Sequence, residues 1–152
     1  MIQRIQTVYL LLALILLGLM AWLPLGEIIA NGDIFTFGIK GVNNIKTGEL
    51  IVNGWPLLAM LAIIELVQLA IIFGYKNRVR QMRFATFNII IMLGLFVVGF
   101  IFVRSSLNTI GDGAYGFKIA MAFPFVAIIL NYLAIRAIGK DEALVRSIDR
   151  IR

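Results

Sequence analysis

The sequence predicts an all-α membrane protein, a bundle of four transmembrane helices with a small β-hairpin or three-stranded sheet in its first outer loop. Of the 152 residues, 61% are hydrophobic and only 14% are charged, which is far more apolar than a soluble domain. Four apolar runs are long enough to cross a hydrocarbon core of about 30 Å, which takes about 20 helical residues. They occupy residues 7–25, 55–75, 84–103 and 119–138 of a single domain, 1–152.

Each run is expected to be a helix, because a lone strand in lipid would leave its backbone groups without hydrogen bonds. The first run continues for a full span after MIQRIQTVYL without an Ala-x-Ala cleavage pattern, so we expect a retained span and not a signal peptide. The chain has neither cysteine nor histidine, which argues against thiol chemistry, haem and zinc. We therefore expect no cofactor, no metal and no enzymatic activity.

Basic residues near the ends of the runs predict the orientation of the chain. The middle loop holds four of them, and the tail 139–152 holds four more. The loop 26–54 holds two lysines against three acidic residues. The positive-inside rule then places both termini and the middle loop in the cytoplasm and the loop 26–54 on the outer side of the membrane. The four basic residues of the middle loop are Lys76, Arg78, Arg80 and Arg83.

The net charge of +6 is thus explained by topology and gives little reason to expect a nucleic acid as partner. The basic loop can also hold anionic lipid headgroups, although ordinary positive-inside topology accounts for it more simply.

The loop 26–54 carries the signals of a small sheet. Asn31-Gly32 lies between two β-prone runs, which predicts a tight hairpin. A third strand at 49–52 is expected to pair with the second strand of the hairpin, because two strands alone are marginal. Phe35, Phe37 and Ile39 share one face of the second strand by its two-residue period. We favour a cap packed on the bundle, and a docking surface for a partner is the alternative.

Two later features, a glycine-rich segment and a proline, are interpreted as a turn and a helix kink without a functional role. The segment 111–116, GDGAYG, is expected to be a turn-rich outward loop, since it lacks the strand and helix that flank a phosphate-binding loop. Pro124 falls inside the fourth run and is expected to kink that helix.

The polar residues inside the apolar runs are the candidate functional residues. Glu65 lies ten residues from either end of the second run, hence near the membrane midplane, and an ionised carboxylate there costs about 2.5–3.5 kcal/mol. Gln68 is one turn further on and on the same face. Asn88 and Asn131 bring carboxamides from the third and fourth runs to the inner half of the bundle, where such groups join helices.

Glu65 is open to three hypotheses. The favoured one is a neutral carboxyl group that donates a hydrogen bond within the bundle. The second is pairing with a polar or cationic group of another subunit. The third is proton or cation handling, for which a second acid or a histidine would be expected along the same path.

The tail 139–152 shows its own helical pattern. Its apolar residues recur at helical spacing and form a candidate docking stripe, and Asp141 and Glu142 suit a helix start. We expect an amphipathic helix lying on the inner membrane surface, with a cytoplasmic docking helix as the alternative. The stripe consists of Leu144, Val145, Ile148 and Ile151.

Three stretches, MIQRIQTVYLLLA, YKNRVRQMRFATFN and KDEALVRSIDRIR, resemble the small four-helix inner-membrane proteins of Bacteroidetes grouped as domain of unknown function 4293. The resemblance covers essentially the whole chain. It implies the four-span topology and a bacterial inner membrane, and it implies no catalytic or binding residues.

The sequence as a whole favours a non-enzymatic membrane scaffold or accessory subunit. Its expected partners are the lipid bilayer and other membrane protein subunits or further copies of itself. The alternative, from a different functional class, is a small oligomeric transporter or channel that uses Glu65 as an intramembrane proton or cation site.

Overall fold

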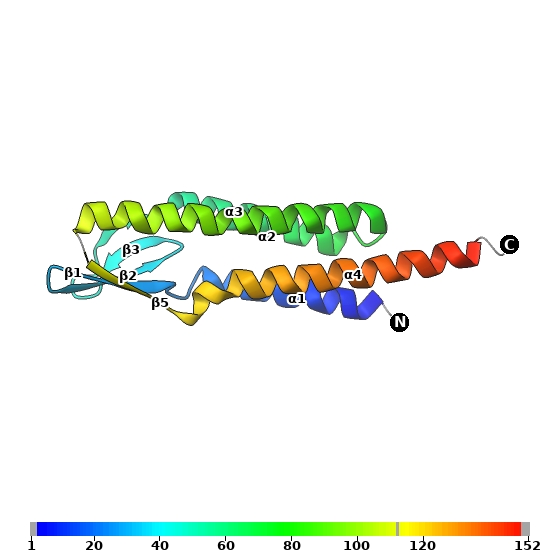
Figure 1. The fold of residues 1–152 in the computed structure, drawn as a ribbon, viewed down its shortest axis with the longest axis horizontal. Helices are drawn as coiled ribbons and strands as arrows, with labels where there is room; N and C mark the ends of the chain where they lie inside the picture. Colours follow the sequence, from blue (N-terminus) through cyan, green and yellow to red (C-terminus); the bar gives the residue numbers. More distant parts are fainter. Residues whose placement is uncertain (1–2, 112, 150–152) are drawn as a thin grey trace.

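Four long helices lie side by side, and a small antiparallel sheet lies at one end of them (Figure 1). The computed structural model describes the backbone of residues 3–111 and 113–149, and the side chains of 5–111 and 113–144. We call the end that carries the sheet the sheet end, and the opposite end, which carries both termini and the turn after the second helix, the terminal end. The helices are α1 (Gln3–Met20), α2 (Trp55–Phe73), α3 (Arg78–Ile110) and α4 (Phe123–Asp149).

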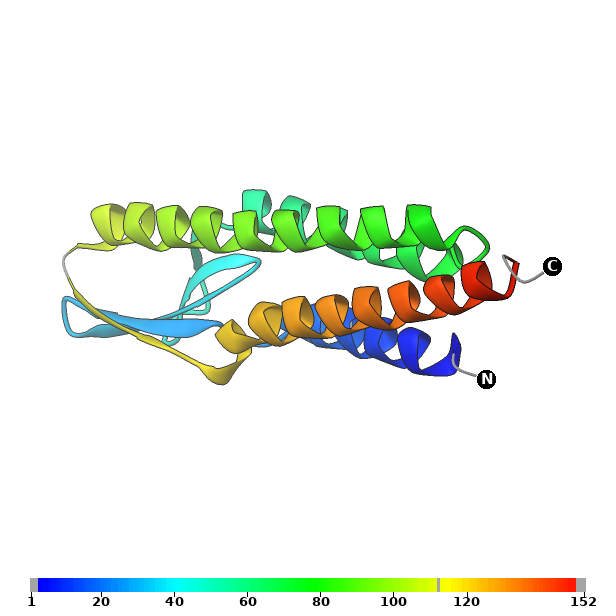
Figure 2. The same cartoon turned by 45° about the vertical axis from the view of Figure 1, so that its right-hand side comes forward.

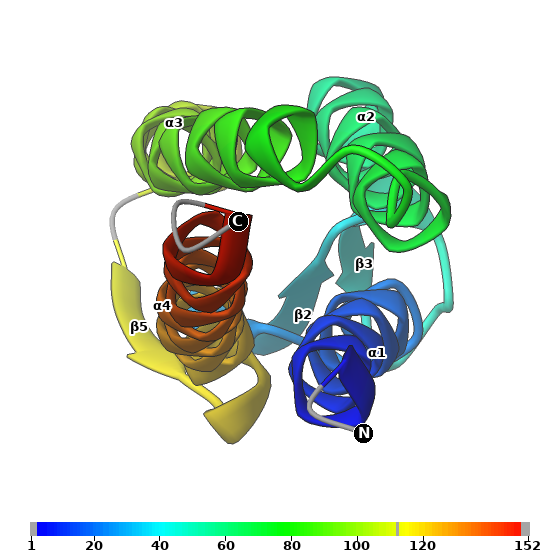
Figure 3. The ribbon, with the colours of Figure 1, turned by 90° about the vertical axis from the view of Figure 1, so that its right-hand side faces the viewer.

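The helices form a ring in which neighbours in sequence are neighbours in space. Seen from the terminal end, α1, α2, α3 and α4 follow one another around the bundle (Figure 3). The most extensive contacts join α1 with α4 and α2 with α3, and the contact between α1 and α2 is the least extensive of the four. The α1–α2 contact is therefore the most open line along the bundle.

Three helical segments of the described chain are long and apolar enough to cross a membrane: α2, α3 and 119–144. The apolar part of α1, Ile5–Met20, is shorter. The first run was predicted to extend to residue 25, but α1 ends at Met20, because Leu25 already belongs to the sheet region, where its N–H donates to the Phe37 carbonyl (2.8 Å). Large apolar side chains are exposed along all four helices, as expected where lipid is the solvent.

The helix α3 is longer than the apolar run 84–103 that predicted it. The Asn77 side chain accepts a hydrogen bond from the Arg80 N–H (3.1 Å) and caps the helix at its start, which satisfies one of the free donors of the first turn. At its other end α3 passes the sheet ends of α1 and α4 and runs beside the sheet (Figure 1 and Figure 2). The apolar run marked only the middle of the helix, because polar residues extend it at both ends.

The sheet has five strands in the order β4-β3-β2-β1-β5. The predicted hairpin is confirmed: Ala30 pairs with Asp33 across Asn31-Gly32, and both turn residues have positive φ (53° and 79°), as a two-residue hairpin turn requires. The strands are β1 (Gly26–Ala30), β2 (Asp33–Gly38), β3 (Gly41–Asn44), β4 (Leu50–Asn53) and β5 (Gly113–Phe117).

The prediction of at most three strands was wrong in two places. The strand predicted at 49–52 is β4, which pairs with β3 and not with β2. The segment read as a turn-rich loop, 111–116, contains most of β5, which pairs with β1. The strands that the sequence analysis missed are β3 and β5, which are rich in glycine or asparagine, residues that are depleted in strands. Backbone pairing with the two strands of the hairpin overrides that weak preference.

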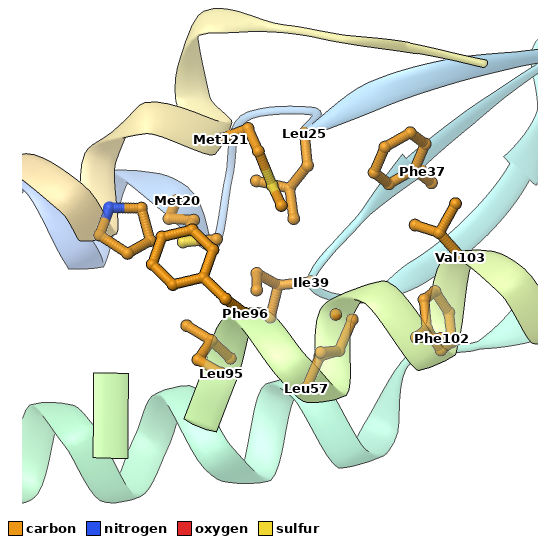
Figure 4. A pocket seen from close by; sticks show the side chains of 12 residues that line it. Met20, Leu25, Phe37, Ile39, Leu57, Leu95, Phe96, Phe102, Val103 and Met121 are labelled. Carbon is orange, nitrogen blue, oxygen red and sulfur yellow. The ribbon is translucent and has the colours of Figure 1, made fainter. Parts of the chain in front are cut away.

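One face of β2 and the residue after it pack on the bundle, as predicted. Phe35, Phe37 and Ile39 are all buried. Figure 4 shows Phe37 and Ile39 among side chains of α1, α2 and α3 around a small apolar cavity of about 20 Å³. The ring of Phe37 also meets that of Phe117 edge-on at 6.1 Å, so β5 is tied to the same core.

Two predictions about the fourth run were wrong. A short 3₁₀ turn, η1 (Ile119–Ala122), precedes α4, and Pro124 lies in the first turn of α4 instead of kinking it; the missing N–H of proline costs nothing there. The tail forms no separate helix starting at Asp141 and Glu142, because α4 continues without a break to Asp149. Burial of Asp141 against α1 gives this extension a tertiary contact.

Candidate functional site

Gln68 links three helices in the middle of the bundle. Its side chain is fully buried on α2. The amide nitrogen donates to the Leu10 carbonyl of α1 (3.0 Å), and the amide oxygen accepts from Nδ2 of Asn88 on α3 (2.7 Å). Interhelical hydrogen bonds of this kind fix which helix faces meet in an apolar solvent.

Asn131 does not join that network. It is fully buried on α4, but its Nδ2 donates to the Ala127 carbonyl of its own helix (2.9 Å). The Oδ1 atoms of Asn88 and Asn131 are both buried without a hydrogen-bond partner among the described residues. Of the three carboxamides predicted to meet, the structure therefore connects Gln68 and Asn88 and leaves Asn131 bonded to its own helix.

Glu65 lies at the contact between α1 and α2, half-buried, with its Oε1 against Gly18 of α1. A methyl group added at Gly18 would lie 3.6 Å from that oxygen. The oxygen is buried and has no hydrogen-bond partner among the described residues. Gly18 and Glu65 define what we call the seam, at the sheet half of the α1–α2 contact. The carboxyl group of Glu65 is thus neither part of the Gln68 network nor paired elsewhere in the described chain.

Two further buried polar contacts hold the terminal end together. The Nε2 of Gln6 on α1 donates to Oδ2 of Asp141 on α4 (2.7 Å), and both residues are buried. The Nε2 of Gln81 on α3 donates to the Ile71 carbonyl near the end of α2 (2.9 Å), which satisfies one of the carbonyls a helix end leaves free. The sequence analysis missed both. The available signal was position: Gln6 and Gln81 each lie four residues before a buried apolar residue of the same helix, and so face the core.

The basic residues of the middle loop have different surroundings. Lys76 lies in the turn between α2 and α3, and Arg80 and Arg83 lie in the first turns of α3; all three are exposed. Arg78 is half-buried, and its Nη1 atom is buried without a hydrogen-bond partner among the described residues. The structure thus distinguishes Arg78 from the other three basic residues.

The predicted tail stripe is described only at its first residue. Leu144 is 54% exposed near the end of α4. The side chains of Val145 and Ile148 and the whole of Ile151 lie outside the described residues.

Within the described residues, no three His, Cys, Asp or Glu side chains lie close enough together to hold a metal ion. The buried polar side chains are mainly amides, which form interhelical or intrahelical hydrogen bonds. Two carboxyl groups accompany them: Asp141, which is bonded to Gln6, and the half-buried Glu65, whose Oε1 has no partner among the described residues. The chemistry available at this site is therefore hydrogen bonding in an apolar medium.

The comparison with curated proteins found no match. A family model described as Domain of unknown function (DUF4293) matches residues 2–151, nearly the whole chain, and this confirms the resemblance noted from its three stretches. The chain therefore belongs to the DUF4293 family.

Proposed function

We propose that the protein crosses the inner membrane of a bacterium four times and acts there as a non-enzymatic scaffold or accessory subunit. In this arrangement the sheet is periplasmic, and both termini and the α2–α3 turn are cytoplasmic. The distribution of basic residues supports this orientation. The exposed apolar side chains on every helix support burial in lipid.

One observation carries the functional part of the proposal: the unpartnered Oε1 of Glu65 at the seam. A buried oxygen without a hydrogen bond costs about 1–3 kcal/mol, and more in lipid than beside water. The Glu65 side chain as a whole is only half-buried, so its carboxyl group can turn toward a polar or cationic donor on a transmembrane helix of another subunit, which would satisfy it. Gly18 has no side chain, so α1 does not cover the carboxyl group at this point. A small residue at such a position lets another helix approach closely.

The neighbours of Glu65 on α2 fit the same role. Leu58 and Leu69 are two turns before it and one turn after it, and they are 44% and 37% exposed. An exposed apolar surface with one embedded acceptor suits a partner helix that brings one donor. Without a partner, the same surface would hold an unsatisfied carboxyl group against lipid.

A transporter is less well supported. Glu65 is the only acidic residue between 50 and 111, and the buried Asp141 of α4 is bonded to Gln6 at the terminal end. Glu65 therefore has no second carboxyl group as a hydrogen-bond partner among the described residues, which a proton path would need. The nearest buried polar side chain one turn away, Gln68, has both its amide groups engaged with other helices.

Two substitutions at Glu65 test the proposal. Glu65→Gln keeps the size and an acceptor oxygen, so proteins that co-purify with the native chain in mild detergent should still be recovered. Glu65→Leu removes the acceptor and should lose them, while the yield of folded chain stays the same. Gly18→Leu serves as a second disruption, because it covers the carboxyl group from the α1 side.

The growth phenotype separates the alternatives. Under the scaffold proposal, Glu65→Gln cells grow as the native strain does, and Glu65→Leu and Gly18→Leu cells share any defect. A transporter needs a carboxyl group that titrates, so Glu65→Gln would abolish function while assembly remained normal. That combination would refute the scaffold proposal.

A further inference from the structure

We propose that a cleft at the terminal end of the α1–α2 contact binds the phosphate headgroup of an anionic phospholipid, with Arg78 as its main ligand. The proposal is independent of the partner proposed for Glu65, because it rests on different residues at the opposite half of the contact. It rests on a cleft, a guanidinium nitrogen without a partner, and the charge and polarity of the surrounding side chains.

The cleft has a volume of about 630 Å³ and opens between the start of α1 and the α2–α3 turn. Seen from the terminal end, this turn faces the start of α1 (Figure 3). The polar side chains of the wall include Gln6, Gln81 and Arg78. The amide nitrogens of Gln6 and Gln81 already donate within the chain. Arg78 is therefore the cationic donor that this wall offers to a ligand.

One donor of the Arg78 guanidinium group lacks a hydrogen-bond acceptor among the described residues. This donor, Nη1, is buried, although a buried donor normally has an acceptor. A phosphate oxygen is the acceptor that a guanidinium group binds best, through two parallel hydrogen bonds. Arg78 is only half-buried and lines the cleft, so a turn of its side chain would present the guanidinium group to an anionic headgroup there.

The charge around the cleft also favours an anion. Lys76, Arg80 and Arg83 are exposed on the same turn and first turns of α3. Two carboxyl groups oppose them. Glu142 of α4 lines an adjoining hollow together with Arg78, and Asp141 accepts a hydrogen bond from Gln6 in the wall of the cleft. The three exposed basic residues and Arg78 make four cations against two carboxyl groups, a net positive surface that favours an anionic headgroup.

The apolar part of the wall points to a lipid and not to a free anion. Val8 and Phe73 line the cleft and are 50% and 73% exposed, and Tyr75 beside them is 62% exposed. The cleft therefore opens onto the apolar outer surface of the bundle, where acyl chains lie. An aromatic residue such as Tyr75 is typical of the depth at which headgroups begin.

The test is native mass spectrometry of the full-length protein, delipidated in mild detergent and then given phosphatidylglycerol or phosphatidylcholine at equal concentration. The native chain should retain one phosphatidylglycerol molecule in preference to phosphatidylcholine. Arg78→Gln should reduce that retention about tenfold, as expected for loss of a charge-assisted hydrogen bond. Arg83→Gln removes the same charge from an exposed position and should change it less than twofold.

Three results would overturn the proposal. The first is equal retention of phosphatidylglycerol by the native chain and Arg78→Gln. The second is an equal loss in Arg78→Gln and Arg83→Gln, which would mean a diffuse charge effect. The third is displacement of the lipid by inorganic phosphate at millimolar concentration, which would mean a site for a free anion. Arg78→Lys controls for folding: it keeps the charge, and it should retain more lipid than Arg78→Gln at the same helical content.

Discussion

Replacing Gln68 tests whether its hydrogen bonds hold α1, α2 and α3 together. Gln68→Leu keeps nearly the same volume, so the change removes hydrogen bonds without opening a large cavity. The hydrogen bonds lost are those to the Leu10 carbonyl (3.0 Å) and from Asn88 (2.7 Å). At about 0.6–1.7 kcal/mol for each interhelical hydrogen bond in a membrane protein, the two together contribute about 1–3 kcal/mol to the free energy of unfolding.

The partner residue makes the prediction sharper. Gln68→Leu also leaves Nδ2 of Asn88 without its acceptor, in a side chain whose Oδ1 already lacks a partner. Removing both side chains, in Gln68→Leu/Asn88→Leu, avoids that unsatisfied donor. The double variant should therefore be more stable than the sum of the two single effects predicts, by about 1 kcal/mol.

The assay is reversible unfolding in mixed micelles with increasing dodecyl sulfate, followed by circular dichroism for the native chain, both single variants and the double variant. Asn131→Leu is the matched control, because its amide nitrogen bonds only to Ala127 of its own helix. It should not show coupling to Gln68→Leu. An unfolding free energy of Gln68→Leu within about 0.3 kcal/mol of the native value, or strictly additive single effects, would refute the reasoning.

Three other predictions concern the sheet, the terminal end and the topology. Gly26→Ala should prevent the sheet from forming, because the new methyl group would lie 2.3 Å from the Gly116 carbonyl oxygen. Limited proteolysis of the outer loop would detect the loss of the sheet. Gly116→Ala is the control, because a methyl group added at Gly116 meets no atom within 4 Å. Gln6→Leu should lower the unfolding free energy by about 1–3 kcal/mol, because it leaves Asp141 buried without its donor, whereas Asp141→Asn, which keeps an acceptor oxygen, should lower it less. A cysteine at Arg80 should not react with a membrane-impermeant reagent in intact cells, and labelling from outside would contradict the proposed orientation.

The sequence predicted the helices better than their ends. Apolar runs show which segments can lie in lipid, and the predicted start of the second run at residue 55 coincides with the start of α2. They do not show where a helix stops, since α3 and α4 continue through charged residues at the terminal end. Capping by Asn77 marks the start of α3, and the contact of Asp141 with Gln6 holds the extension of α4 beyond its apolar run. Both depend on contacts that an apolar run does not report.

The sheet shows what local sequence signals cannot supply. Asn31-Gly32 identified the hairpin because the turn type demands those residues. The strand β5 carried no such signal, since GAYGF is short and holds two glycines. It is a strand because it pairs with β1, and that pairing is a tertiary contact between loops more than 80 residues apart in their numbering.

The candidate residues divide in the same way. Depth along a helix can be counted from the sequence, so Gln68 and Asn88 could be expected to meet. Rotation about the helix axis decides the partner, and Asn131 hydrogen-bonds to its own helix instead. The half-buried position of Glu65 beside Gly18 and the buried nitrogen of Arg78 could not be predicted, because both depend on how closely α1 packs against α2.

The most direct test of the central claim, that a partner helix docks at the seam, is photocrosslinking in living cells. A benzoylphenylalanine placed at Leu69, one turn from Glu65 and 37% exposed, should give one defined crosslinked product. The product should disappear when Glu65→Leu is introduced into the same chain. The same probe at Ile90, which is 59% exposed on α3, should not give it. No defined product at Leu69, or the same product from both positions, would contradict the account.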